Sequence, residues 1–319
     1  MRSPLGLVVA VASAVALLTG APPATAAPPA LTFALIGDTP YDTVQRLRFP
    51  ALVDEINADP AVRMVLHAGD VKSGSSLCSD LRLADRARLY DTFADPFVLT
   101  PGDNDWTDCH RVADGQYVPT ERLDKVRSLF YPVPGMTQGQ HPARVLDQPS
   151  VQPQHSAYVE NVAFERGGAL FATVHIVGSE NDLAPWDQLP GGDLPRLRLT
   201  EFADRRAANV DWINATFNRA ESEGLAGVLL LMQAEPTDSR GFQTERALIL
   251  KRAAAFGRPV LLVHGDEHMY EVEPNYGGVP NLTRLETFGD TARHWIRVSV
   301  DPASSAVFSW EPQTLRQAA

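Results

Sequence analysis

Cysteine, lysine and long apolar runs are all scarce in this sequence. Two cysteines are too few for a disulfide-rich scaffold or for a four-cysteine zinc site. Lysine occurs only three times, and 39 acidic residues face 28 Lys and Arg residues, for a net charge of −11. Charge therefore argues against a nucleic-acid-binding surface or an anionic-lipid-binding one. Only the N-terminus carries a sustained apolar run.

Residues 1–27 have the pattern of a secretory signal peptide. Arg2 supplies the positive charge, residues 5–18 form the apolar segment, and residues 24–26 are small enough for cleavage. The apolar segment is short for a membrane span, although an uncleaved anchor is the alternative. We expect a secreted, periplasmic or extracellular protein whose residues 28–319 form one domain without stable membrane association.

The dipeptide Gly-Asp ends four apolar runs. Short apolar runs that end in glycine are typical of buried strands in a parallel sheet, and ligands bind beyond the carboxyl ends of such strands. Several carboxylates at one sheet edge need a cation to neutralise them, so the pattern predicts a metal site. Two other pairs, at Asp193 and Asp290, are interpreted as turns. The four runs read LTFALIGD, RMVLHAGD, PFVLTPGD and PVLLVHGD, and they end at Asp38, Asp70, Asp103 and Asp266.

The spacing of the first three aspartates indicates an α/β fold. They lie 32 and 33 residues apart, the length of a strand, a loop and a crossover helix. Helices are expected over residues 43–58 and 80–94, which gives a βαβαβ unit with a parallel core. Residues 131–154, rich in Pro, Gly and Gln, are expected to form a lid or an insertion near the site. Beyond Met269, short strands at residues 295–300 and 306–310 suggest an antiparallel second sheet.

Cys78 and Cys109 each follow one of the acidic strand ends by a few residues. An even number of cysteines in an exported chain suggests a disulfide, which here would join two loops of the site. A free reactive thiol is the alternative.

The order of the strand-end motifs resembles that of the calcineurin-like metallophosphoesterases. That family carries D-x-H, GDxxD, GNH[DE], a strand-end His and GHxH, and the resemblance runs from about residue 32 to residue 300. It implies two mixed β-sheets flanked by α-helices, and hydrolysis of a phosphate mono- or diester by metal-activated water. The corresponding segments here begin at Gly37, Gly69, Gly102, Gln233 and Gly265.

The resemblance implies six metal ligands. Pro40 replaces a family histidine and cannot coordinate, although the adjacent Tyr41 could. The set of Asp70, Asp103, Gln233 and Asp266 would coordinate only through oxygen, which favours Mn²⁺ or Mg²⁺, with Ca²⁺ possible. The set of Asp38, Asp70 and His268 includes an imidazole and also tolerates Fe or Zn. One or two ions per chain are expected. Asp38, Asp70 and His268 match family ligands directly, with Asp70 bridging, whereas Asp103, Gln233 and Asp266 stand in place of Asn, His and His.

Three further residues are candidates for catalysis on a phosphorylated small molecule. Asn104 replaces the family histidine that stabilises or protonates the leaving oxygen. Lys72 could contact phosphate or could be a solvated loop residue, and His110 could be a general acid or a surface histidine. Loss of a general acid typically costs roughly 10²–10⁴-fold in rate. The alternatives are therefore a non-catalytic relative that binds a metal or a phosphorylated ligand, and a structural exported protein.

Overall fold

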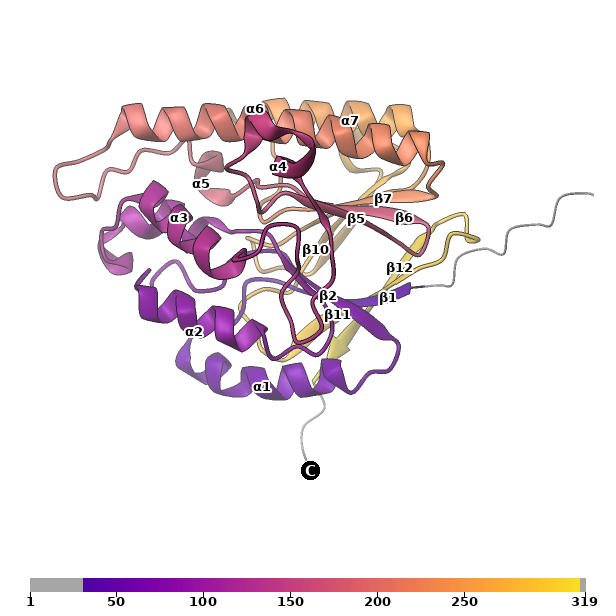
Figure 1. Cartoon of the computed structure of the whole chain (residues 1–319), viewed down its shortest axis with the longest axis horizontal. Coiled ribbons are helices and arrows are strands. Elements are labelled where there is room, and N and C mark those ends of the chain that lie inside the picture. Colours follow the sequence, from indigo (N-terminus) through magenta and orange to yellow (C-terminus); the bar gives the residue numbers. More distant parts are fainter. Residues whose placement is uncertain (1–30, 316–319) are drawn as a thin grey trace, which may run out of the picture.

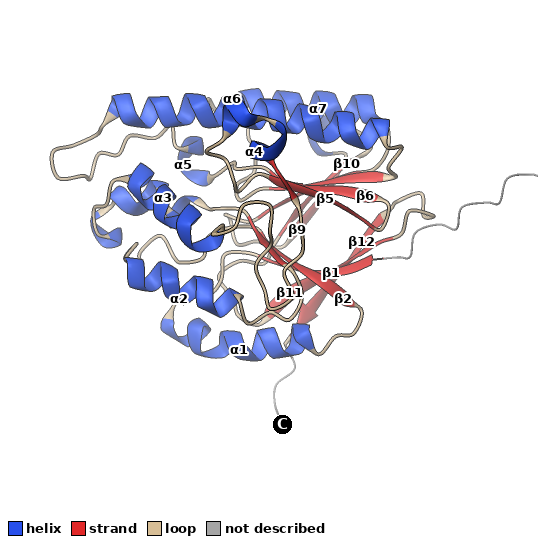
Figure 2. Cartoon of the chain, in the orientation of Figure 1, coloured by secondary structure: helices blue, strands red, loops and turns tan. Residues whose placement is uncertain are grey.

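The computed structural model describes residues 31–315, so the expected leader at residues 1–27 lies outside the described residues. Two β-sheets pack face to face, and helices cover both outer faces (Figures 1 and 2). The five-stranded sheet has the order β12-β11-β1-β2-β3, and the seven-stranded sheet has the order β4-β5-β6-β7-β8-β10-β9. The predicted sandwich of two mixed sheets is confirmed.

The first sheet contains the expected βαβαβ unit. Strands β1, β2 and β3 are parallel, and α1 and α2 connect them. Both helices begin with a side-chain cap, from Asp42 and Ser79 respectively. The elements are β1 (Leu31–Ile36), α1 (Thr43–Asn57), β2 (Val62–His67), α2 (Asp80–Tyr90) and β3 (Phe97–Leu99), followed by α3 (Pro119–Phe130).

The second sheet has a parallel centre and antiparallel edges. Strands β6, β7, β8 and β10 are parallel, and α6 (Pro195–Ser222) and α7 (Gln243–Phe256) cover their outer face (Figure 1). The strands are β4 (Leu146–Asp147), β5 (Val162–Arg166), β6 (Ala169–Thr173), β7 (Gly227–Leu231), β8 (Val260–His264), β9 (Glu271–Pro274) and β10 (Leu282–Glu286).

The prediction that the strands at residues 295–300 and 306–310 belong to an antiparallel second sheet was wrong. Strand β11 (His294–Val300) pairs with the open edge of β1, and β12 (Phe308–Thr314) pairs with β11. Both pairings are antiparallel, but they extend the first sheet. Ile296 and Val298 are buried between the two sheets, and this burial explains why the strand joins the existing core.

The connection over residues 131–154 lies at the side of the sandwich. Gln138 bridges to Phe97 of β3, and Leu146 pairs with Ala163 of β5. The segment, which includes the one-turn helix α4 (Gln148–Val151), therefore joins the edges of the two sheets. In the described part of the chain, no helix is both long and apolar enough to cross a membrane.

Candidate metal centre

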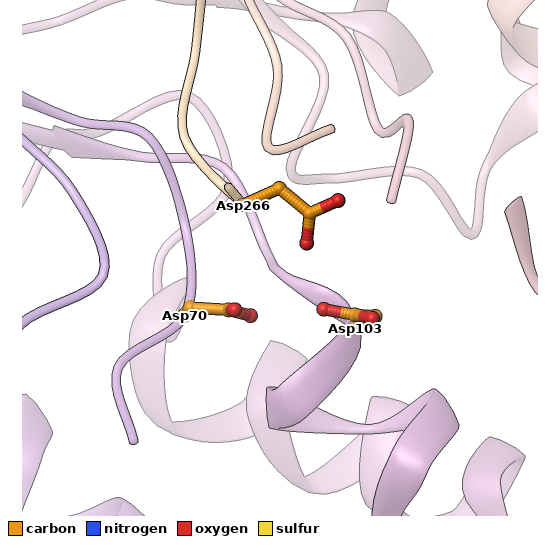
Figure 3. A group of neighbouring side chains, drawn as sticks. All are labelled: Asp70, Asp103 and Asp266. Atoms are coloured by element: carbon orange, nitrogen blue, oxygen red, sulfur yellow. The ribbon is translucent and has the colours of Figure 1, made fainter. Parts of the chain in front are cut away.

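The carboxyl ends of β2, β3 and β8 bring three aspartates together. Each of Asp70, Asp103 and Asp266 offers an oxygen within 4.8 Å of the others. Figure 3 shows the three carboxyl groups facing a common space. Because β8 belongs to a different sheet from β2 and β3, the cluster spans the junction of the two sheets. The three predicted strand ends therefore meet.

Asp38, after β1, adjoins this cluster through the backbone of Asp266, whose N–H donates to Asp38 Oδ1 over 3.1 Å. The backbone of Asp38, Asp70 and Asp266 is left-handed, with φ of 52°, 58° and 80°. A non-glycine residue in this region is uncommon, and such strain concentrates at functional sites. Position 265 has to be glycine, because a Cβ there would lie 2.0 Å from Asp38 Oδ2. The glycine of one Gly-Asp pair thus leaves room for the aspartate side chain of another.

Gln233, which follows β7, turns its amide nitrogen toward the three-aspartate cluster. Its Nε2 lies 2.7 Å from Asp266 Oδ1, 3.1 Å from Asp103 Oδ1 and 3.3 Å from Asp70 Oδ2. Its Oε1 accepts a hydrogen bond of 2.7 Å from the Gly178 N–H. An amide nitrogen is a donor and not a metal ligand. Coordination through Oε1 would therefore require the amide to rotate away from Gly178.

The hydroxyl of Tyr41 lies between Asp38 and His268, much as the Gln233 amide lies among the three aspartates. It lies 3.3 Å from Asp38 Oδ1, 3.0 Å from Asp70 Oδ2 and 3.0 Å from His268 Nε2. His268 Nε2 is itself 3.6 Å from Asp38 Oδ1. The six predicted ligands therefore form one continuous group, with the Gln233 amide at one end and the Tyr41 hydroxyl at the other.

Burial and mutual repulsion disfavour the charged carboxylates. Desolvation, followed by the charge of Asp103, raises the pKa of Asp70 well above its usual range. Desolvation and the charge of Asp38 raise the pKa of Asp266 to about 7. The hydrogen bond to Asp38 raises the pKa of His268. A divalent cation would stabilise the ionised carboxylates, and their oxygens suit a hard cation. The residues present therefore fit a divalent metal ion.

Asn104 lies beside the cluster, where the sequence places it, but its amide is engaged. Its Nδ2 donates to Asp70 Oδ2 over 2.6 Å and lies 3.2 Å from the Tyr41 hydroxyl. The backbone N–H of Asn104 donates to the other Asp70 oxygen over 3.1 Å. These bonds make Asn104 a support for the central carboxylate.

Lys72 and His110 make no hydrogen bond to Asp70, Asp103 or Asp266 in the described part of the chain. Lys72 is fully buried, and its Nζ lies 2.8 Å from Asp114 Oδ1 and donates to the Ser73 carbonyl. His110 is 7% exposed, and its Nδ1 has no hydrogen-bond partner among the described residues. Burial lowers the pKa of His110. Lys72 therefore stabilises the loop after β2, instead of facing the site.

Sequence reasoning missed three residues that border the cluster. Asp108 accepts a hydrogen bond of 2.6 Å from Ser179 Oγ and pairs with Arg111 over 2.7 Å. Ser179 Oγ also lies 3.2 Å from Asp103 Oδ2. Ser179 belongs to α5 (Gly178–Asn181), a single turn with left-handed backbone at Ser179 and Glu180. The Gly-Ser pair beyond β6 is the one sequence signal that could have indicated this contact.

The predicted disulfide is present. Cys78 and Cys109 are bonded, with 31 residues of sequence separation and Cα atoms 5.8 Å apart. The bond joins the loop after β2 to the loop after β3, so the segments that follow Asp70 and Asp103 are covalently connected.

The family model of the calcineurin-like phosphoesterases matches residues 31–270. The chain belongs to this family. Its members are metal-dependent and act on phosphorylated substrates, and the cluster of Asp70, Asp103 and Asp266 could hold such a metal ion. No curated protein sequence matches the chain.

Solved structures that are similar to this chain over 90% of its length include the following three. One is GAP50, the anchor in the inner membrane complex of Plasmodium, with 13% identity, a TM-score of 0.45 and 90% of that chain covered. Another is the purple acid phosphatase PPD1 of yellow lupin (Lupinus luteus), with 8% identity, a TM-score of 0.47 and 54% of that chain covered. The third is the calcineurin-like phosphoesterase YfkN of Bacillus subtilis, with 11% identity, a TM-score of 0.41 and 91% of that chain covered.

Proposed function

We propose that this protein is an exported metal-dependent hydrolase of phosphate esters, with its site at the strand-end carboxylates. The convergence of Asp70, Asp103 and Asp266 within 4.8 Å carries the proposal. Asp38 and His268 would complete the ligand set, and Gln233 would join it through Oε1 after rotation of its amide. The oxygen-rich set favours Mn²⁺ or Mg²⁺, one or two ions per chain.

A cation held by these residues supplies polarisation of the phosphoryl group and increased acidity of the attacking water. The protein's own contribution is placement. Asn104 and Tyr41 fix the orientation of Asp70 through hydrogen bonds of 2.6 and 3.0 Å. A carboxamide N–H is too weakly acidic to act as a general acid, so Asn104 cannot protonate a leaving oxygen. Esters of phenols, whose oxygen departs without full protonation, are therefore the favoured substrates.

Hydrolysis of an aryl phosphate by metal-free protein, before and after addition of each divalent ion, tests this proposal. Wild-type protein should gain activity with Mn²⁺ or Mg²⁺, whereas Asp70→Asn and Asp38→Ala should lose it. Asp204→Asn, an exposed aspartate on α6, is the matched control and should keep full activity. Inactivity on aryl mono- and diesters with Mn²⁺, Mg²⁺, Ca²⁺, Zn²⁺ and Fe²⁺ would contradict the proposal.

Export is supported by the leader-like residues 1–27 and by the Cys78–Cys109 disulfide, since disulfides persist in oxidising compartments. In this proposal, removal of residues 1–27 leaves a single domain over residues 28–319. N-terminal sequencing of protein recovered outside the cytoplasm tests it. A recovered chain that begins at Met1 would contradict cleavage.

One observation favours a second function, a non-catalytic metal- or phosphate-binding protein. Gln233 directs a hydrogen-bond donor at the same oxygens that a second metal ion would need. Calorimetry and an ester assay together distinguish the two functions. A binding protein would take up Mn²⁺ and inorganic phosphate in the calorimeter but release no product from any ester in the assay.

A further inference from the structure

Arg111 is held beside the carboxylate cluster by a buried acid. Its Nη1 lies 2.7 Å from Oδ2 of Asp108, and its Nη2 lies 3.4 Å from Oγ of Ser179. The Asp108 side chain is 2% exposed, whereas the Arg111 side chain is 38% exposed. One buried carboxylate thus orients a guanidinium that still reaches solvent.

Two independent observations place this guanidinium at the edge of the site. Ser179 joins Arg111 to the cluster, because its Oγ also lies 3.2 Å from Asp103 Oδ2. On the other side, a Cβ built on Gly74 would lie 2.5 Å from Asn104 Oδ1 and 3.4 Å from Arg111 Nη1. Asn104 and Arg111 therefore both lie against Gly74, on the side of the loop that carries the carboxylates.

The backbone around Arg111 is also firmly held. Its carbonyl accepts N–H groups from Asp114, Gly115 and Gln116, each over 3.1 Å. Cys109, two residues earlier, is bonded to Cys78. The held backbone and the pairing with Asp108 together limit the freedom that the Arg111 side chain loses when it binds a ligand, and this preorganisation favours affinity.

We infer that Arg111, positioned by Asp108, binds the phosphoryl group of the substrate and selects a terminal phosphate over a diester. This inference rests on the proposed function of the carboxylate cluster. A guanidinium presents a planar fork of N–H donors that matches two phosphate oxygens. A monoester has three terminal oxygens and can offer some to Arg111 while others face the cluster. A diester has only two, so it gains less from Arg111.

Binding of inorganic phosphate to Mn²⁺-loaded protein, measured by calorimetry, tests whether Arg111 binds phosphate. Arg111→Gln should raise the dissociation constant at least tenfold, and Arg111→Lys should raise it by a smaller factor, because the charge remains but the fork is lost. Arg219→Gln is the matched control, since Arg219 pairs with Glu223 on the surface of α6. Unchanged phosphate binding in Arg111→Gln would overturn the inference.

Steady-state kinetics separates this inference from the proposed function. For an aryl monoester, Arg111→Gln should raise KM at least tenfold, whereas for the matching diester KM should change less than threefold. An equal change for both esters overturns the selectivity. If the wild-type protein hydrolyses neither ester, the proposed function fails. Weaker phosphate binding in Arg111→Gln would then still support the role of Arg111 as a phosphate ligand. Thermal unfolding shows whether each variant is folded. If Arg111→Gln does not fold, the comparison is made with Arg111→Lys instead.

Discussion

The carboxylate of Asp70 occupies the space that a side chain on Gly102 would need. A Cβ on Gly102 would lie 1.9 Å from Asp70 Oδ1 and 2.4 Å from the Asp70 backbone nitrogen. Gly102 precedes Asp103, so the glycine of one Gly-Asp pair makes room for the aspartate of another. The pairs are therefore required together, as parts of one packed site.

Gly102→Ala should displace Asp70 and weaken metal binding. Overpacking of this kind costs about 1–3 kcal/mol of stability, and we expect Mn²⁺ affinity to fall at least tenfold. Titration of Mn²⁺ into metal-free protein measures the second effect. Gly191→Ala is the control: its φ of 104° makes the substitution strained, but nothing lies within 4 Å of a Cβ there, so it destabilises without displacing Asp70. Equal Mn²⁺ affinity in the two variants would show that Asp70 does not bind the ion.

Gln233→His should increase metal affinity. The substitution removes the N–H donor that lies 2.7 Å from Asp266 and supplies a ring nitrogen that can coordinate. Because imidazole suits zinc better than magnesium, the gain in affinity should be larger for Zn²⁺ than for Mg²⁺. Competition titrations with both ions, on wild-type protein and on the variant, measure the ratio. Gln243→His, at an exposed position in the first turn of α7, should leave both affinities unchanged.

Much of the fold could be predicted because it depends on local pattern. The βαβαβ unit follows from apolar strands and evenly spaced Gly-Asp pairs, and the placement of Asp38, Asp70 and Asp266 follows from strand ends in a sandwich. The assignment of β11 to the first sheet could not be predicted in this way. It depends on which strand edge is left open, and the edge of β1 is more than 250 residues away in the sequence.

The side-chain orientations in the site also depend on distant partners. Lys72 looks like a site residue until its partner Asp114, 42 positions later, is known. Arg111 has no recognisable motif, and its role depends on Ser179 in a left-handed turn 68 positions away. Contacts of this kind are set by tertiary packing, so spacing within the sequence does not reveal them.

Glu245 should make the protein less stable as pH rises from about 4.5 to about 7. This carboxyl is fully buried, and desolvation raises its pKa from 4.5 to about 7. In that interval the unfolded chain releases the proton before the folded protein does, so ionisation favours unfolding. Glu245→Gln is uncharged throughout and should gain about 2 kcal/mol relative to wild type between pH 5 and pH 8. Urea unfolding in EDTA at both pH values measures the change, and a constant difference would contradict the shifted pKa.

Asn104→His should restore hydrolysis of poor leaving groups. An alkyl oxygen needs a proton as it departs, and a histidine next to Asp70 could supply one, whereas the Asn104 amide cannot. We expect kcat for an alkyl phosphate to rise at least tenfold, and kcat for the matching aryl phosphate to change less than threefold. The alkyl activity should also fall at alkaline pH, as the imidazolium loses its proton. Asn218→His, at an exposed position on α6, should change neither rate. An equal gain for both esters would instead mean that the substitution acts on Asp70 or the metal ion, and that leaving-group protonation is not what Asn104 lacks.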